Sequence, residues 1–392
     1  MAIKRIRPQE PITFIVNKKI RHTYETETDT KLEDRLTSLP ESLQLHILSN
    51  LDAQYAVQTS VLSKSLVSLW KSIPILTLSS YSFKKLNTFD RFVKKVVCQS
   101  VNVDTLIFKR GETSSKKILE KVISHACSSN VKHLDLWIKR AKLGTWPVPL
   151  HFYPDSLKSL KLQSEADVLC SYLGSQAILF KNLTELYLQN ATIRDLDPFS
   201  GFRVLNKLTL SGCKVDTCGN TLNIHSKHIS ELIILGAYCG KYINCIELMT
   251  PKLRMFEYEG FDHFPMLKTC DGLPNLDSMV IGSREVHCVD NEKRKFDNLL
   301  MFFMKVYNVK LLKIFPAIVY MLGSFPDELV NRCTPFQDLK SLTLDFGDFH
   351  FENVFGHRHG FWTQEGWEAA ISVVKDYLLC KSPDAEYTIF VS

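Results

Sequence analysis

The spacing apolar-x-x-apolar-x-apolar returns ten times between residues 103 and 344. In each copy the last two apolar residues are separated by one position, and this period of two is that of a short β-strand with one buried face. Successive copies start 22 to 33 residues apart. Their apolar positions are Val103/Leu106/Phe108, Val131/Leu134/Leu136, Leu157/Leu160/Leu162, Leu183/Leu186/Leu188, Leu205/Leu208/Leu210, Ile229/Leu232/Ile234, Leu253/Phe256/Tyr258, Leu276/Met279/Ile281, Val309/Leu312/Ile314 and Leu339/Leu342/Leu344. The sequence therefore predicts a series of short strands joined by connections of similar length.

A unit of this length cannot bury its own apolar face, so neighbouring units must stack to form a core. A period in the twenties with this strand motif is typical of a leucine-rich-repeat solenoid. Positions between the strand anchors are expected on the concave face, and they are Asp135, Trp137, Lys161, Tyr187, Thr209, Ile233, Glu257, Val280, Lys313 and Thr343. No single charge dominates this set, so it predicts a binding face without naming a ligand. We take Trp137, Tyr187 and Glu257 as candidate substrate contacts, with ordinary solvated strand positions as the alternative.

Two insertions interrupt the period. The first contains residues 291–295 (NEKRK), which we interpret as a solvated charged turn. The second, residues 345–362, gathers aromatic and histidine side chains, of which Phe349, His350, Phe361 and Trp362 are further candidate substrate contacts. Long loops on repeats often bind partners, but a hydrophobic plug over the solenoid end is the alternative. After it, a helical period over 367–380 and an alternation over 387–391 predict one atypical terminal helix-strand unit.

The segment before the repeats has a helical period instead. Leu39-Pro40 places proline at a first helical turn, where its missing N–H costs nothing. Asp52 and Ser63 are placed to cap a second and a third short helix, and Pro74 ends the third. Residues 1–33 are polar and lack either period, so we expect a disordered or extended tail. Three short helices bury little surface alone and need a partner or the repeats to pack against.

These helices carry a resemblance. Residues 34–43 (DRLTSLPESL), 46–51 (HILSNL), 56–64 (AVQTSVLSK) and 69–70 (LW) resemble the F-box of plant F-box/leucine-rich-repeat (F-box/LRR, FBD-like) proteins. The module order matches too, with an F-box-like domain at 34–80 followed by repeats at 81–392. The family implies a substrate-recognition adaptor of an SCF-type cullin ubiquitin ligase. Its partners would be a SKP-type linker subunit, through it a cullin, and a protein substrate. By their match to the motif, the implied linker contacts are Leu39, Pro40, Leu43, Ile47, Leu48, Val61, Leu62, Leu66 and Trp70.

The chain departs from the family at one place. Members usually carry Arg-Trp-Arg after the Ser-Lys, whereas this chain has Ser65-Leu66-Val67. Arginine offers several hydrogen-bond donors and tryptophan is a large interface anchor, so the change weakens the expected linker dock. The alternative function is a free-standing protein- or ligand-binding scaffold. A second alternative, for the apolar residues of the motif, is that several of them only pack the three helices together.

The composition and the absence of known motifs bear on which functional classes the chain can belong to. The net charge of +6 is mild, and no basic stripe with interleaved aromatics predicts nucleic-acid binding. No run reaches the length of a membrane helix, and no signal sequence is evident. Eleven scattered cysteines without a two-residue gap indicate reduced thiols, in cytoplasm or nucleus. His350, His357 and His359 stand without a persuasive thiol or carboxylate, so we expect neither a metal nor another cofactor. No catalytic motif appears, which leaves a repeat-based hydrolase as the weakest reading and a non-catalytic α+β or α/β repeat protein as the main one.

Overall fold

The computed structural model of the chain describes residues 35–111, 116–139, 154–165, 168–170, 180–236, 243–260, 265–283, 292–347 and 364–391. The expected tail at 1–33 lies outside these residues, as do four candidate contacts, Phe349, His350, Phe361 and Trp362. The described elements combine a small helical unit at the N-terminal end with a long run of strands and helices. The expected mixture of helix and strand is thereby confirmed.

The N-terminal helical unit comprises α1 (Glu41–Ser49), α2 (Ala53–Gln58) and three 3-10 turns, η1 (Thr59–Val61), η2 (Lys64–Leu66) and η3 (Leu69–Ser72). Pro40 and Asp52 occupy the N-cap positions of α1 and α2, so both helices begin where the sequence predicts. The Asp52 side chain makes no capping hydrogen bond, so the expected cap of α2 is not confirmed. The third predicted helix is wrong in form, because η2 and η3 replace a single α-helix. The physical reason is that serine side chains can replace backbone hydrogen bonds of a helix. The Ser63 hydroxyl accepts a hydrogen bond from the Ser65 backbone N–H, and such local bonds favour turns over an α-helix.

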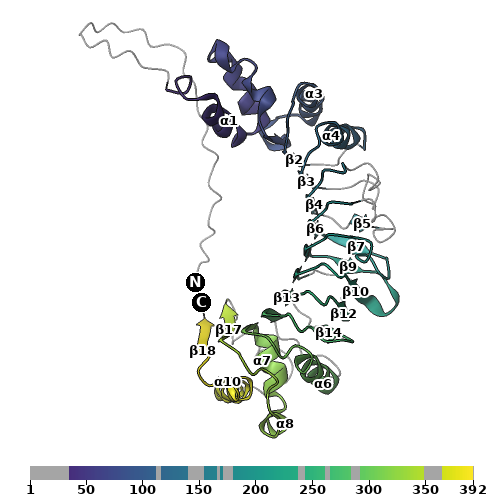
Figure 1. Cartoon of the computed structure of the whole chain (residues 1–392), viewed down its shortest axis with the longest axis vertical. Helices are drawn as coiled ribbons and strands as arrows, with labels where there is room; N and C mark the ends of the chain where they lie inside the picture. Colours follow the sequence, from purple (N-terminus) through teal and green to yellow (C-terminus); the bar gives the residue numbers. More distant parts are fainter. Residues whose placement is uncertain are drawn as a thin grey trace, which may run out of the picture.

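Within the described residues, 12 strands form one parallel sheet that curves into an arc (Figure 1). In spatial order they are β1 (Ile75–Ser79), β2 (Thr105–Arg110), β3 (His133–Ile138), β4 (Ser159–Ser164), β6 (Glu185–Gln189), β8 (Lys207–Ser211), β11 (Glu231–Leu235), β13 (Met255–Gly260), β15 (Ser278–Ser283), β16 (Leu311–Ile314), β17 (Ser341–Gly347) and β18 (Glu386–Val391). Every predicted strand is present. The spacing Ile73/Leu76/Leu78 is a further copy of the motif that the sequence analysis missed, and it forms β1.

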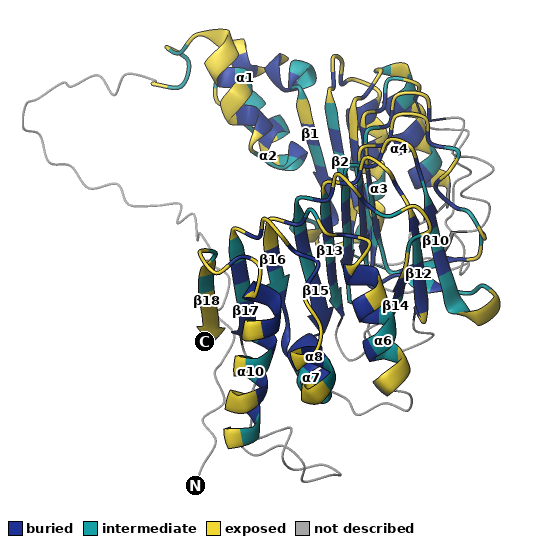
Figure 2. Cartoon of the chain, turned by 60° about the horizontal axis from the view of Figure 1, so that its bottom comes forward, coloured by how far each residue is buried: buried dark blue, intermediate teal, exposed yellow. Residues whose placement is uncertain are grey.

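The register of the sheet aligns the anchors of successive units. Leu208 of β8 pairs with Leu232 of β11, which lies beside Phe256 of β13, and Leu210, Ile234 and Tyr258 form the next row. These side chains are buried, as are the first anchors, such as Leu205 and Leu253, that precede each strand. A single continuous core therefore runs along the sheet, and Figure 2 shows it as a band of buried residues.

The outer side of the arc is lined by a second layer (Figure 1). At the N-terminal end it consists of α3 (Leu86–Val97) and α4 (Lys116–Ser128), and at the C-terminal end of α6 (Glu292–Phe303), α7 (Pro316–Gly323), α8 (Pro326–Val330) and α10 (Gln364–Leu379). Between them lie two three-stranded sheets, β5 (Val168–Cys170), β7 (Ala191–Ile193) and β9 (Lys214–Val215), then β10 (Thr221–His225), β12 (Cys245–Met249) and β14 (Met266–Lys268). Short 3-10 turns, η4 (Ser80–Ser82) and η6 (Cys218–Asn220), complete the connections.

Two predictions near the C-terminal end had different outcomes. The charged turn expected at 291–295 is wrong, because residues 292–295 form the first turn of α6. Phe296, Leu299 and Phe303 bury one face of that helix, and Lys293 pairs with Asp297 one turn later, which extends it toward its N-terminus. The terminal helix-strand unit is confirmed as α10 followed by β18. Among the helices with described residues, none combines the length and apolar character that a bilayer crossing requires.

Candidate functional site

The helical unit exposes several large apolar side chains. Val61 is 87% exposed, and Leu62 beside it is also exposed. Leu43 and Ile47 are exposed on α1, four residues apart and therefore on one face of that helix. Pro40 is exposed and Leu39 half-buried at the entrance of the same helix. Six of the nine expected linker contacts are thus on or near the surface of this unit.

The other three expected contacts are buried inside the chain. Leu48 and Leu66 are each 1% exposed, and Trp70 is almost as deeply buried. They join the core that continues through Ile73 into the first strands. For these residues the structure favours the alternative, that they pack the helices together, because a motif match does not distinguish an apolar residue that faces inward from one that faces a partner. Leu66 is therefore not available on the surface of this chain, in contrast to the exposed Ser65 and Val67 that flank it.

The positions between the strand anchors form one row across the concave face. Adjacent register pairs run without a break through Asp135, Lys161, Tyr187, Thr209, Ile233, Glu257, Val280, Lys313 and Thr343. Trp137 lies one row further along β3. Since neighbouring strands lie about 4.8 Å apart, Trp137 and Tyr187 are separated by about 10 Å across the sheet, and Tyr187 and Glu257 by about 14 Å. The three candidate contacts therefore share a face but do not form one pocket.

The N-terminal end of this face is aromatic. The ring centroids of Tyr81 and Trp137 are 5.7 Å apart in a tilted contact. Beside them, the Gln163 side-chain amide donates a hydrogen bond of 2.6 Å to the Asp135 carboxylate. Burial raises the pKa of Asp135, and the hydrogen bond from Gln163 and the nearby Lys161 oppose that effect. Tyr81 was missed from the sequence because it follows β1, the strand whose motif was overlooked.

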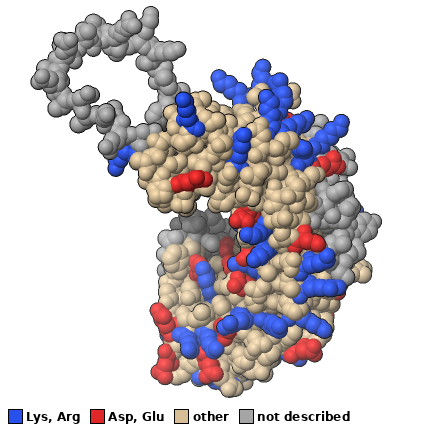
Figure 3. Space-filling model, turned by 45° about the horizontal axis from the view of Figure 1, so that its top comes forward, with Lys and Arg blue, Asp and Glu red and all other residues tan. Residues whose placement is uncertain are grey.

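Charges in the middle and C-terminal parts of the face offset one another. Lys207 pairs with Glu231 at 2.8 Å, and Lys313 pairs with Asp345 at 2.6 Å. Burial raises the pKa of Glu257, and repulsion from Glu259 adds to that increase. In the view of Figure 3, acidic and basic side chains are interspersed along the strand region. Such a face suits a partner with both apolar and mixed-charge groups better than it suits a polyanion.

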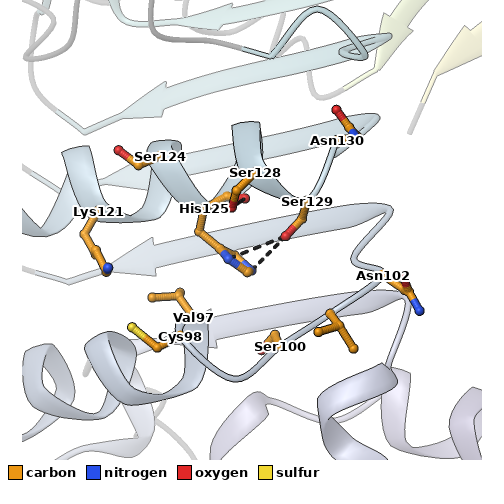
Figure 4. A pocket seen from close by; sticks show the side chains of 11 residues that line it. Val97, Cys98, Ser100, Asn102, Lys121, Ser124, His125, Ser128, Ser129 and Asn130 are labelled. Carbon is orange, nitrogen blue, oxygen red and sulfur yellow. Dashed lines mark hydrogen bonds between the residues drawn. The ribbon is translucent and has the colours of Figure 1, made fainter.

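A polar cleft of about 670 Å³ lies between the ends of α3 and α4 (Figure 4). His125 points into it, with both ring nitrogens 3.5 Å from the Ser129 hydroxyl. Burial, and then the positive charge of Lys121, lowers the pKa of His125, so its imidazole is neutral at pH 7. None of the described residues that line the cleft carries a carboxylate, and 3.5 Å is long for a hydrogen bond. The arrangement therefore offers no paired acid and base for catalysis.

A second cleft, of about 930 Å³, lies where the chain enters the strands of the C-terminal half. Three of its charged side chains pair with each other, since Asp277 accepts from Arg254 at 3.1 Å and from Lys310 at 2.8 Å. These two cations lower the pKa of Asp277. In the described ranges no group of three or more potential ligands is arranged to hold a metal ion. Eight of the cysteines in those ranges, those whose side chains the structure describes, are free thiols.

Comparison with known proteins connects this geometry to a family. The F-box domain model matches residues 36–78, which include the helical unit and all of β1 except Ser79. An F-box/LRR-repeat protein of Arabidopsis thaliana is 27% identical over 324 residues, covering 78% of this chain and 94% of that protein. An FBD-associated F-box protein of the same plant is 26% identical over 333 residues, covering 80% of this chain and 71% of the relative. Another, a probable FBD-associated F-box protein, is 42% identical over 250 residues, covering 58% and 56%. The resemblance to the plant F-box/LRR family is thereby confirmed.

Proposed function

We propose that this F-box chain is the substrate-recognition adaptor of an SCF-type cullin ubiquitin ligase. Its F-box would dock a SKP-type linker subunit, and through it a cullin, while its repeats recruit a protein substrate. The observation that carries the proposal is the F-box match at 36–78, on a unit whose Leu43, Ile47, Val61 and Leu62 are exposed. Several exposed large apolar side chains on one small unit are typical of a protein interface.

The repeats, at 81–392, are proposed to form a leucine-rich-repeat solenoid that carries the substrate face. Supporting this are the in-register anchors, the arc of parallel strands and the relatives that are named LRR-repeat proteins. Trp137 and Tyr187 are the side chains we expect to matter most, because large aromatic residues dominate interface energies. The four candidate contacts at 349–362 remain proposals of the same kind.

The proposed adaptor acts by proximity and has no catalytic step of its own. Holding a substrate beside the ubiquitin-charged subunit raises its effective concentration there, which is how a tether accelerates transfer. The free thiols among the described cysteines accord with a reducing compartment, so we place the protein in the cytoplasm, the nucleus or both. Membrane and nucleic-acid partners are not part of the proposal.

The linker dock is tested by measuring the affinity of the full chain for a purified plant linker subunit. Val61→Asp/Leu62→Asp places charge on two exposed residues, so the fold should persist while binding weakens by more than about 2 kcal/mol, or about 30-fold. Val330→Asp is a matched control, because Val330 is 76% exposed on α8, outside the helical unit. Equal linker affinity for the double variant and the control would contradict this dock.

The scaffold alternative rests on Ser65-Leu66-Val67. Because Ser65 and Val67 are exposed while Leu66 is buried, the two flanking positions are the ones that an arginine could use. If the wild-type chain does not bind any linker subunit, Ser65→Arg/Val67→Arg should create binding, and the chain is then better treated as a free-standing scaffold. Binding by the wild-type chain excludes the scaffold alternative.

Substrate recruitment is tested by proximity labelling in plant cells with the wild-type chain and with Trp137→Ala/Tyr187→Ala. The expected result is loss of a subset of labelled proteins, with the linker and cullin labelled equally in both. The matched control is Met301→Ala/Met304→Ala, two exposed apolar residues at α6, on the outer layer. An unchanged set of labelled proteins in the aromatic variant would contradict recruitment through this part of the concave face.

A further inference from the structure

The two edge strands of the 12-stranded sheet differ in whether another described element covers them. At one end, β1 is covered by the helical unit: α1 and α2 contact it, and Asp52 forms an isolated parallel bridge with Thr77. At the other end, β18 pairs with β17 alone among the described strands. An uncovered edge strand presents a row of backbone donors and acceptors to any strand that can pair with it.

The core row also ends in an exposed side chain at β18. Ile389 is in register with Leu344, which is in register with Ile314, and that residue with Ile281. These three are fully buried, whereas Ile389 is 44% exposed. Its neighbour Phe390 is exposed as well. One more apolar strand beside β18 would bury Ile389 as the other residues of its row are buried.

The backbone of β18 fixes which residues offer pairing groups. The Glu386 N–H donates to the Lys340 carbonyl of the β17 side, and successive residues along a strand point to opposite edges. The N–H and C=O groups of Tyr387, Ile389 and Val391 therefore face outward. Glu386, the first residue of β18, is charged and exposed, but its backbone groups face β17. From 387 to 391 the strand contains no charged residue and no proline, so these positions lack two of the devices that block edge pairing.

We propose that β18 pairs with β18 of a second copy of this chain, antiparallel and around a two-fold axis at Ile389. In this register Ile389 lies opposite its own counterpart, and Tyr387 lies opposite Val391. These are the three residues whose backbone groups face outward, so the register joins hydrogen-bonding positions to one another. The pairing opposes no two charges of like sign within 387–391, as a self-complementary interface requires. It would extend the sheet across both copies and bury Ile389 between them.

The test is sedimentation of the full chain over a range of concentrations up to about 100 μM, which covers the affinity expected of a small interface. The wild-type chain should shift from monomer to dimer. Ile389→Lys opposes two like charges at the axis and should weaken dimerisation at least tenfold. Leu311→Lys is the matched control, since Leu311 is similarly exposed but lies on the interior strand β16.

A second variant separates the effect of lost backbone hydrogen bonds from the effect of an added charge. Ile389→Pro removes an N–H group that faces outward and leaves the hydrogen bonds to β17 in place. An edge strand tolerates proline at such a position, so this variant should fold and should also be a monomer. Amide exchange of the wild-type chain needs no variant: the N–H groups of Tyr387, Ile389 and Val391 should become more protected as concentration rises. A wild-type monomer at the highest concentration, or concentration-independent exchange at these amides, overturns the proposal and leaves the edge to a strand of another protein. Dimers of undiminished affinity in both variants overturn it equally.

Discussion

Apolar residues of the same kinds have different environments in the helical unit and in the sheet. In the sheet, anchors such as Leu208, Phe256 and Leu344 are fully buried, because each strand is flanked by two others and covered by the outer layer. In the helical unit, Leu48 is buried while Leu43 on the same helix is 48% exposed. A short unit has too little interior for all of its apolar residues. An anchor residue of the strand motif therefore indicates a buried position in the sheet. In the helical unit, an apolar residue can be either buried in the core or exposed for an interface.

Truncation in the sheet should have the largest effect on stability. Phe256→Ala removes a fully buried ring from the middle of the core and should lower the free energy of unfolding by about 3–5 kcal/mol. Urea denaturation of the full chain measures the loss. Ile233→Ala, on the half-buried concave row of the adjacent strand, is the control and should cost clearly less. Equal losses would mean that the two faces of the sheet are equally packed, which would break the comparison.

Within the helical unit, helix α1 should contain one residue that matters for stability and a neighbour that matters for binding. Leu48→Ala should destabilise that unit by about 2–4 kcal/mol, because its side chain is enclosed. Ile47→Ala changes an exposed neighbour and should alter stability by less than about 1 kcal/mol, yet weaken linker binding. Thermal unfolding of the full chain measures the first effect, and linker affinity measures the second. Stability losses of similar size would show that Ile47 also belongs to the core.

A backbone substitution probes how closely β15 approaches the outer layer. Gly282 has φ near 137°, and a Cβ at this position would lie 2.8 Å from the Cβ of Phe315. Gly282→Ala should therefore cost about 1–3 kcal/mol in the free energy of unfolding, from backbone strain and overpacking together. Gly219→Ala is the control, since its φ is also positive but the nearest contact is 3.9 Å away. A smaller loss at Gly282 than at Gly219 would contradict the close approach.

The smallest expected effect concerns charge on the concave face. Burial and Glu259 raise the pKa of Glu257 above its ordinary value of 4.5, so the folded state holds this proton more tightly than the unfolded state does. The stabilisation from this residue is therefore complete below pH 4.5 and is lost as pH rises through the raised pKa. Glu257→Gln should raise the melting temperature slightly at pH 7 and leave it nearly unchanged at pH 4. A gain of equal size at both pH values would contradict the raised pKa.

How much of this fold the sequence predicts depends on how local each signal is. Strand positions followed from a motif that repeats with the period of two, and its single omission was Ile73/Leu76/Leu78. The charged residues at 292–295 were read as a turn because the buried face of α6 begins only at Phe296. Helices α3, α4, α7 and α8 were not predicted at all, because the strand motif does not specify what connects the strands. Among the candidate linker contacts, the motif did not distinguish Val61 and Leu62, which are exposed, from Leu48 and Trp70, which are buried.

The sequence by itself determined the strand order and the row of residues between the strand anchors, because both depend on spacing along the chain. The tertiary structure alone decided which apolar residues remain outside the core, since burial depends on neighbours that are distant in sequence. Leu66 is enclosed while Val67 is exposed, and Ile389 is exposed although Leu344 of the same row is not. The physical reason is that a side chain is removed from water only when another element lies against it, and at the two ends of the sheet those elements differ.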